Sequence, residues 1–139
     1  MSTSERVKQI VGWVLHVPVA GLMLFAGANK VFASPELVEQ MQKFGLGDNA
    51  RLIGSGEVVS ALLLLVPRTS SLGLLLTSAF WGGAICTHMA HGESYLLQSG
   101  LLLLTWVGAY LRNPATLSSF FPAAAKSQPV PVHSEALAS

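Results

Sequence analysis

Four long apolar runs alternate with short polar segments along most of the chain. The polar segments contain residues that end or turn a helix, such as Pro67 to Ser70 and Arg112-Asn113-Pro114. Each run approaches the roughly 20 residues that cross about 30 Å of hydrocarbon as a helix. Backbone polar groups inside a membrane must be satisfied within their own segment, so these runs are expected to be helices. The four predicted membrane spans are residues 10–28, 52–66, 72–87 and 95–111.

The segment from Ser34 to Gly45 has the pattern of a short amphipathic helix. Ser34 can cap its start, Pro35 suits the first helical position, and Gly45 can end it. Its apolar residues share one face, and its polar residues lie elsewhere: Leu37, Met41 and Phe44 against Glu36, Glu39, Gln40 and Lys43. Two interpretations stay open, a lid over the other helices and a connector that rests on lipid headgroups.

The composition favours a membrane protein. Only 11% of the 139 residues are charged and 51% are hydrophobic, with a mean hydropathy of +0.54, whereas ordinary globular chains carry about 25% charged residues. The net charge of +1 gives no reason to expect a nucleic-acid partner, and the single cysteine, Cys86, excludes an intrachain disulfide. The expected fold class is an all-α, integral membrane four-helix bundle with a short amphipathic helix in its first outer loop. A protein of this class is expected to have the lipid bilayer as a partner.

The chain is expected to form one domain, residues 1–114, followed by a disordered cytoplasmic tail, residues 115–139, rich in Ala, Ser and Pro. An even number of spans places both termini on the same side of the membrane. That side holds Arg6, Lys8, Arg68, Arg112 and Lys126, against Lys30, Lys43 and Arg51 on the other. Because cytoplasmic loops carry more Lys and Arg, both termini are expected in the cytoplasm. A cleaved signal peptide is the alternative for the first run, although that run is longer than the usual apolar core of such peptides.

One carboxylate stands inside an apolar run. Glu57 lies in the stretch IGSGEVVSALLLLVP, and an ionisable group in the membrane costs a few kcal/mol, about 2.5–3.5 for Asp, Lys or Arg. Glu57 is therefore expected to face the interior of the bundle and to have a partner there. Sorting the other polar residues by depth places several of them in the same outer layer: Asn29, Lys30, Thr87, His88 and Gln98.

Helical spacing places most of these residues on shared faces, because positions three and four apart are neighbours. The four predicted seams are His16, Ala20, Met23, Gly27 and Lys30; Gly54, Glu57 and Ala61; Gly73, Thr77, Ala84 and His88; and Gln98, Thr105 and Arg112. Small residues on these seams allow helices to approach closely. The predicted ligand site is a polar cluster of Glu57, Lys30, His88, Asn29 and Gln98. The alternative interpretations assign no ligand site. In them Lys30 extends its charged end to the membrane surface, and His88 and Gln98 form ordinary hydrogen bonds between helices.

The histidines do not favour a haem or a metal. His16 lies towards the cytoplasmic half and His88 near the outer end, so the two cannot ligate one haem from both sides. His88 and His91 are three residues apart, but only Glu93 is near enough to add a third ligand. Trp13 fits an inner aromatic belt, and Trp81 is expected to pack inside the bundle.

Several segments together resemble the DoxX-like family: FAGANKVF, IGSGEVVSALLLLVPRTSSLGLL, GGAICTHMAHGE and WVGAYLRNP. The resemblance covers about Val7 to Pro114. It implies a small four-helix protein of the bacterial cytoplasmic (inner) membrane, whose relatives associate with membrane redox systems. The family takes its name from a subunit of a thiosulfate:quinone oxidoreductase. Lys30, Glu57 and His88 are the residues that match the family's polar positions.

Three functional hypotheses follow. The first is an accessory or ligand-binding subunit of a membrane redox system that takes a quinone-like or other amphipathic molecule. If the chain takes part in catalysis, it is expected to do so as an oxidoreductase subunit and not as a self-contained enzyme. The second is a non-catalytic scaffold that docks a partner membrane protein or forms a homo-oligomer. The third is a proton-coupled transporter of a small solute that works as an oligomer, although four short helices lack the repeats typical of transporters.

Overall fold

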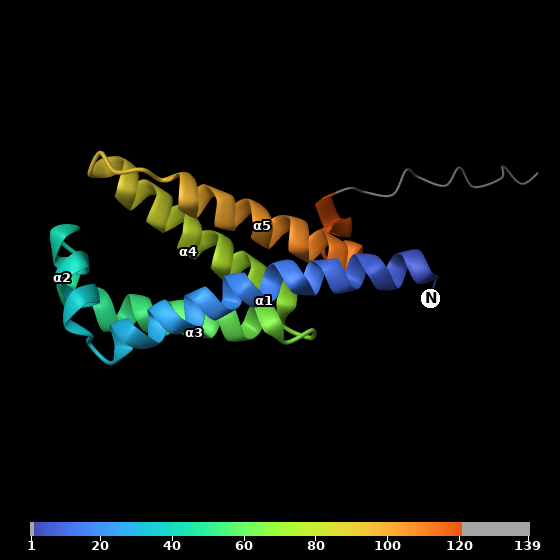
Figure 1. The fold of residues 1–139 in the computed structure, drawn as a ribbon, viewed down its shortest axis with the longest axis horizontal. Coiled ribbons are helices and arrows are strands. Elements are labelled where there is room, and N and C mark those ends of the chain that lie inside the picture. Colours follow the sequence, from blue (N-terminus) through green and yellow to red (C-terminus); the bar gives the residue numbers. More distant parts are fainter. Residues whose placement is uncertain (1, 121–139) are drawn as a thin grey trace, which may run out of the picture.

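The computed structural model describes residues 2–120, and this part of the chain is built from helices (Figure 1). The long helices are α1 (Thr3–Val31), α3 (Ala50–Leu65), α4 (Ser70–Ala90) and α5 (Leu96–Arg112). A short helix, α2 (Pro35–Lys43), and two 3₁₀ helices, η1 (Gly47–Asn49) and η2 (Pro114–Phe120), complete the order. The predicted all-helical class is confirmed, and the short helix predicted between Ser34 and Gly45 is present as α2.

Each of the long helices packs against two others, so that they close a ring. α1 packs against α3 and α5, and α4 packs against the same two helices. Figure 1 shows that the N-terminus, the α3–α4 turn and the end of α5 lie towards one end of the molecule. We call this the N-terminal end. The opposite end carries α2 and the α4–α5 connection, and we call it the α2 end.

Local sequence explains where several helices begin and end. α1 starts with a capping box, in which Ser2 Oγ accepts from the backbone of Glu5 and the Glu5 carboxylate accepts from Ser2 N at 2.9 Å. Gly45, just after α2, has φ 70°, a conformation that suits glycine. The prediction for Ser34 was wrong in one respect. It occupies the N-cap position of α2, but its side chain makes no capping hydrogen bond, and Pro35 with its fixed φ starts the helix instead.

The predicted start of the disordered tail, residue 115, lies before the end of the helical part of the chain. Residues that we assigned to a disordered tail from position 115 start instead as η2, and Leu117 packs against the buried cluster of Leu64, Leu74 and Ala109. The turn into η2 is held by Asn113, whose side-chain oxygen accepts from Ala115 N at 3.1 Å. Burial of one leucine and a local hydrogen bond therefore order this stretch. The rest of the predicted tail lies outside the described residues.

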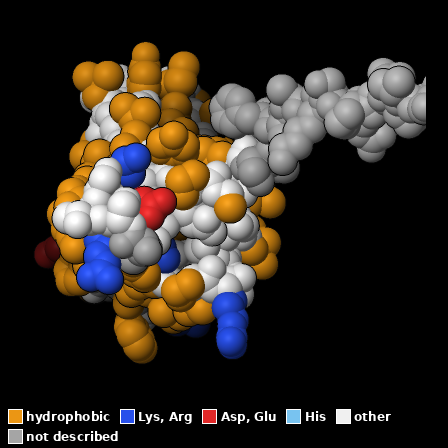
Figure 2. All heavy atoms as spheres, turned by 90° about the vertical axis from the view of Figure 1, so that its right-hand side faces the viewer, with side chains coloured by type: hydrophobic (Ala, Val, Ile, Leu, Met, Phe, Trp, Pro, Cys, Tyr) orange, Lys and Arg blue, Asp and Glu red, His pale blue; other side chains and the backbone are white. Residues whose placement is uncertain are grey.

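Apolar side chains cover the outward faces of the long helices as well as the core. Val19, Ala20, Met23, Ala61 and Trp81 form a buried cluster. Large apolar side chains are nevertheless more than half exposed on α1, α4 and α5, including Phe25, Leu75 and Leu103. Figure 2, which looks at the molecule from the N-terminal end, shows hydrophobic side chains projecting around its sides. α1 and α4 are long and apolar enough to cross a membrane, and so large an exposed apolar surface marks an interaction site for lipid or protein.

Candidate binding cavity at the α2 end

Two glycines bring α1 and α3 into close contact next to the predicted polar cluster. A Cβ atom on Gly27 would lie 2.9 Å from the carbonyl oxygen of Gly54, and a Cβ atom on Gly54 would lie 2.7 Å from that of Gly27. Both distances are too short for a real side chain, so this crossing requires glycine on both helices. Lys30 and Glu57 each follow their glycine by three residues, which places them on the same faces one turn further along.

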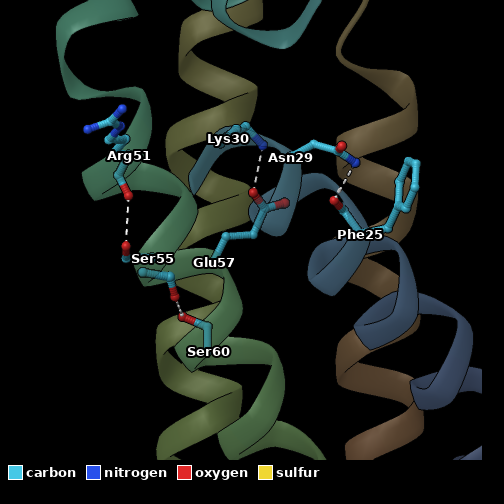
Figure 3. Close-up of polar contacts among 8 residues, drawn as sticks. Phe25, Asn29, Lys30, Arg51, Ser55, Glu57 and Ser60 are labelled. Atoms are coloured by element: carbon cyan, nitrogen blue, oxygen red, sulfur yellow. Dashed lines mark hydrogen bonds and ion pairs between the residues drawn. The ribbon is translucent and has the colours of Figure 1, made fainter. Parts of the chain in front are cut away.

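The close crossing brings Lys30 and Glu57 into a buried ion pair. Lys30 Nζ donates to Glu57 Oε2 at 2.6 Å, and the two side chains are 11% and 2% exposed. Figure 3 shows the two side chains pointing toward each other from α1 and α3. The Lys30 ammonium also lies 5.8 Å from the centre of the Phe80 ring, close enough for a cation–π attraction. The partner that the sequence required for Glu57 is therefore Lys30.

A second polar pair joins α4 to α5. His88 Nε2 and Gln98 Nε2 are 2.9 Å apart, which requires the amide to donate and the imidazole nitrogen to accept. His88 then carries its proton on Nδ1, which lies 3.1 Å from Glu93 Oε2. That contact has the distance of an ion pair but not the directions of a hydrogen bond, since His88 Nδ1 has no hydrogen-bond partner within residues 2–120. The imidazole is thus fixed on one side by an amide and approached on the other by a carboxylate.

Both polar pairs lie on the wall of one cavity of about 520 Å³. Its wall is otherwise mostly apolar, with residues such as Leu22, Ile53, Phe80 and Leu101 from the four long helices. The apolar face of α2 forms another side through Leu37, Met41 and Phe44. Sites for drug-sized small molecules typically have a volume of roughly 300–1,000 Å³, an apolar wall and a few polar groups.

α2 is joined to the opposite side of the cavity by one aromatic side chain. The ring of Phe44 lies 5.2 Å from that of His88 and 5.1 Å from that of His91, measured between centroids. Both contacts have the tilted or edge geometry that aromatic pairs prefer. This arrangement favours the lid interpretation of the amphipathic helix over the headgroup connector.

Replacing Phe44 by alanine is expected to loosen α2 and leave the long helices intact. Losing the two ring contacts removes about 1 kcal/mol of attraction beyond the lost burial, so backbone amides of α2 should exchange with deuterium about tenfold faster. Hydrogen-exchange mass spectrometry of α2 and α3 peptides measures this directly. Phe32→Ala is the matched control, because Phe32 is 84% exposed. Equal exchange of α2 in the two variants would show that Phe44 does not hold the lid.

Three buried polar atoms on this wall, His88 Nδ1 among them, have no hydrogen-bond partner within residues 2–120. Trp81 Nε1 and Gln98 Oε1 make no hydrogen bond within the described part of the chain. The first is a donor and the second an acceptor, and an unsatisfied buried polar group costs about 1–3 kcal/mol. Native structures rarely leave such groups unpaired without a functional reason. Only a packing role was predicted for Trp81, because helical spacing does not reveal which way an indole N–H points.

The structure separates Asn29 from the residues with which we grouped it. Its amide donates to the carbonyl oxygen of Phe25 on its own helix at 2.8 Å, and Asn29 does not line the cavity. Figure 3 shows the Asn29 side chain extending away from Glu57. Consecutive residues on a helix are about 100° apart, so Asn29 and Lys30 cannot share a face. The cavity wall thus holds Lys30, Glu57, His88 and Gln98 of the predicted cluster, together with Thr87.

His16 and His88 have separate surroundings. His16 is buried between α1 and α5 and bonds to the carbonyl oxygen of Thr105 at 2.7 Å, about 21 Å along α1 from Lys30 at 1.5 Å per residue. Within residues 2–120, no three His, Cys, Asp or Glu side chains gather in a way that could hold a metal ion.

Comparison with known proteins gives one match. The family model described as the DoxX-like family matches residues 14–109, which covers α1 from its middle through nearly all of α5. Neither the curated proteins nor the solved structures gave a match. The resemblance found in the sequence motifs is therefore confirmed by a match over well more than half of the chain.

Proposed function

The chain belongs to the DoxX-like family and is a small membrane protein, and from this we propose that its four long helices cross the membrane as a bundle. α1 and α4 have the length and hydropathy of membrane spans. α3 and α5 are shorter, with 16 and 17 residues, but they carry exposed leucines such as Leu62 and Leu103 on their outer faces. Lipid around all four helices would cover this apolar surface.

The distribution of basic residues supports a bacterial inner-membrane location with both termini in the cytoplasm. The N-terminal end carries Arg6 and Lys8 at the start of α1, Arg68 in the α3–α4 turn and Arg112 at the end of α5. Figure 2 shows Lys and Arg side chains at this end. Basic residues near the ends of spans are retained on the cytoplasmic side. The α2 end would then face the outer side of the membrane.

The function that the geometry supports best is binding of an amphipathic small molecule in the cavity beneath α2. One observation carries this proposal. A cavity of about 520 Å³ with a mostly apolar wall contains an ion pair, an imidazole and three buried polar atoms that make no hydrogen bond within residues 2–120, all at the same end of the bundle. A ligand with an apolar body and a few hydrogen-bonding groups would match both parts of that wall.

A quinone-like molecule satisfies the unpaired groups. A quinone carbonyl oxygen is an acceptor for a donor such as the Trp81 N–H, and the hydroxyl of the reduced form is a donor for an acceptor such as Gln98 Oε1. His88 is placed to exchange a proton with such a ligand, since its imidazole lies on the wall between an amide and the Glu93 carboxylate. Lys30 is already neutralised by Glu57, so its role would be to orient that carboxylate.

This ligand class fits an accessory or ligand-binding subunit of a membrane redox system. A quinone carries reducing equivalents between membrane proteins, so a protein that binds one would work beside a redox enzyme of the same membrane. The scaffold hypothesis is the competitor, because the Lys30–Glu57 pair satisfies itself and could serve only to fix helix register. The two hypotheses differ in whether the wild-type protein carries a small molecule.

Native mass spectrometry of protein released gently from its own membrane tests the proposal. The wild type is expected to carry an adduct of a few hundred daltons, and Glu57→Gln is expected to lose most of it. Glu36→Gln is the matched control, because it makes the same chemical change on the exposed side of α2. Trp81→Phe is a second variant that removes an N–H from the wall and leaves the ion pair in place.

The outcomes separate ligand binding from scaffolding. Loss of the adduct in folded Trp81→Phe and Glu57→Gln, with retention in Glu36→Gln, supports a site beneath α2, and the mass gives the ligand class. An adduct retained in all variants would place the ligand elsewhere. A wild type with no adduct but with a bound protein chain, or as a homo-oligomer, would instead support a scaffold.

A further inference from the structure

A second cavity, whose wall is more polar than that of the first, lies at the N-terminal end of the molecule, opposite α2. Its volume is about 310 Å³, and its wall includes Gln9, Ser70, Asn113 and Arg112. These residues come from the start of α1, the start of α4 and the end of α5. The cavity is separate from the one beneath α2, and the two share no lining residue.

A close crossing of α1 and α5 holds His16 and Arg112 in place, much as the crossing of α1 and α3 holds Lys30 and Glu57. A Cβ atom on Gly12 would lie 2.9 Å from the carbonyl oxygen of Gly108, so α1 and α5 touch here backbone to backbone. One turn along α1 from Gly12, His16 accepts from Arg112 Nη1 at 2.7 Å through Nδ1 and donates to the Thr105 carbonyl oxygen through Nε2. One proton on Nε2 satisfies both contacts, so the imidazole is neutral in this arrangement.

Arg112 is therefore a fixed cation without an acidic partner. Its guanidinium lies 3.7 Å from the centre of the Trp13 ring and donates to the carbonyl oxygen of Leu64 at 2.8 Å. No carboxylate within residues 2–120 forms an ion pair with it. Arg112 Nη2 also donates to the carbonyl oxygen of Leu65 at 3.5 Å. A charge held by one ring, one neutral imidazole and two carbonyl oxygens retains its attraction for an anion. The position at the end of α5 offsets only a small part of the charge through the helix dipole.

We propose that this cavity binds a phosphate group, carried either by an anionic lipid headgroup or by a free phosphate compound. Arginine matches the geometry of phosphate oxygens through its planar fork of N–H donors. Gln9, Ser70 and Asn113 add neutral polar groups to the wall, which can hydrogen-bond the remaining oxygens. Basic pockets between membrane helices on the cytoplasmic side are known to suit anionic headgroups, and this end carries Arg6, Lys8 and Arg68 as well.

The test is a titration of the detergent-solubilised full chain, followed by native mass spectrometry. The probes are dioctanoyl phosphatidylglycerol, dioctanoylglycerol without phosphate, and inorganic phosphate. Gln9→Glu places a carboxylate on the cavity wall and is expected to weaken phosphate binding about tenfold. Lys8→Gln is the matched control, because it lowers the net charge by the same one unit at an exposed neighbouring position outside the wall. Neither variant touches the Arg112 contacts, so folding is preserved.

Each outcome decides the proposal. Tighter binding of the phosphatidylglycerol than of dioctanoylglycerol, weakened by Gln9→Glu and not by Lys8→Gln, supports the site and assigns it to a lipid headgroup. The same pattern with inorganic phosphate as the stronger ligand supports the site and assigns it to a free phosphate. Equal binding of the two lipids with no binding of inorganic phosphate, or equal weakening by the two variants, would overturn it.

Discussion

Replacing Lys30 by methionine is expected to lower the free energy of unfolding by about 3–5 kcal/mol, because Glu57 would be left buried without its partner. The two side chains are 11% and 2% exposed and their N–O distance is 2.6 Å, so the lost contact is a buried, charge-assisted hydrogen bond. The double variant Lys30→Met with Glu57→Leu is expected to recover most of the loss, because it removes both charges and fills the space with apolar atoms. Unfolding by sodium dodecyl sulfate in mixed micelles measures these differences.

The control for this series is Lys43→Met. Lys43 lies 3.7 Å from Glu39 on α2, and both side chains are more than two-thirds exposed. An exposed pair of this kind contributes little, so a change within about 0.5 kcal/mol is expected. If Lys30→Met were no more destabilising than Lys43→Met, the Lys30–Glu57 contact could not be the buried pair that joins α1 to α3.

Replacing Gly73 by alanine, which adds a single methyl group, is expected to lower the free energy of unfolding nearly as much as Lys30→Met. A Cβ atom at this position of α4 would collide with backbone atoms of Leu63 and Leu64 on α3, which cannot move aside as a flexible side chain can. Overpacking typically costs about 1–3 kcal/mol and occasionally more, and a collision with backbone belongs at the upper end of that range. Gly73→Ala should therefore lower the unfolding midpoint sharply in the same detergent titration.

Gly82→Ala is the matched control on the same helix. A Cβ atom there meets nothing within 4 Å, so the substitution should increase stability by about 0.5–1 kcal/mol through the better helix propensity of alanine. Opposite signs for the two variants are the expected result. Equal effects would mean that α3 and α4 do not approach each other as closely at Gly73.

Helical spacing alone predicted much of what the structure shows on single helices. The seam of His16, Ala20, Met23, Gly27 and Lys30 is buried along its whole length, and Gly54, Glu57 and Ala61 are buried on α3. Sorting by depth placed Lys30 among several candidate partners of Glu57, and the structure identifies Lys30 as the partner. That the four long helices form a membrane bundle and that the cavity binds a ligand stay predictions.

Contacts between helices were harder to predict, since they depend on which helices are neighbours. His16 and Arg112 were placed on inward faces, but nothing in either seam indicated that α1 lies against α5 closely enough for a 2.7 Å bond. That contact needs Gly12 and Gly108 at the same crossing. Trp13 likewise appeared as an interfacial aromatic residue and proves to be the surface on which Arg112 rests.

If α3 crosses the membrane as proposed, its length has a consequence for the lipids around it. Its 16 residues span about 24 Å, less than the roughly 30 Å of an average hydrocarbon layer. A bilayer around such a helix becomes locally thinner, at a cost of a fraction of a kcal/mol per Å of mismatch. Glu57 lies seven residues after the first residue of α3, so thinning on that side brings headgroups and water toward the carboxylate. Acyl-chain length would then regulate how readily protons and amphipathic molecules reach the cavity, without any change in the protein itself.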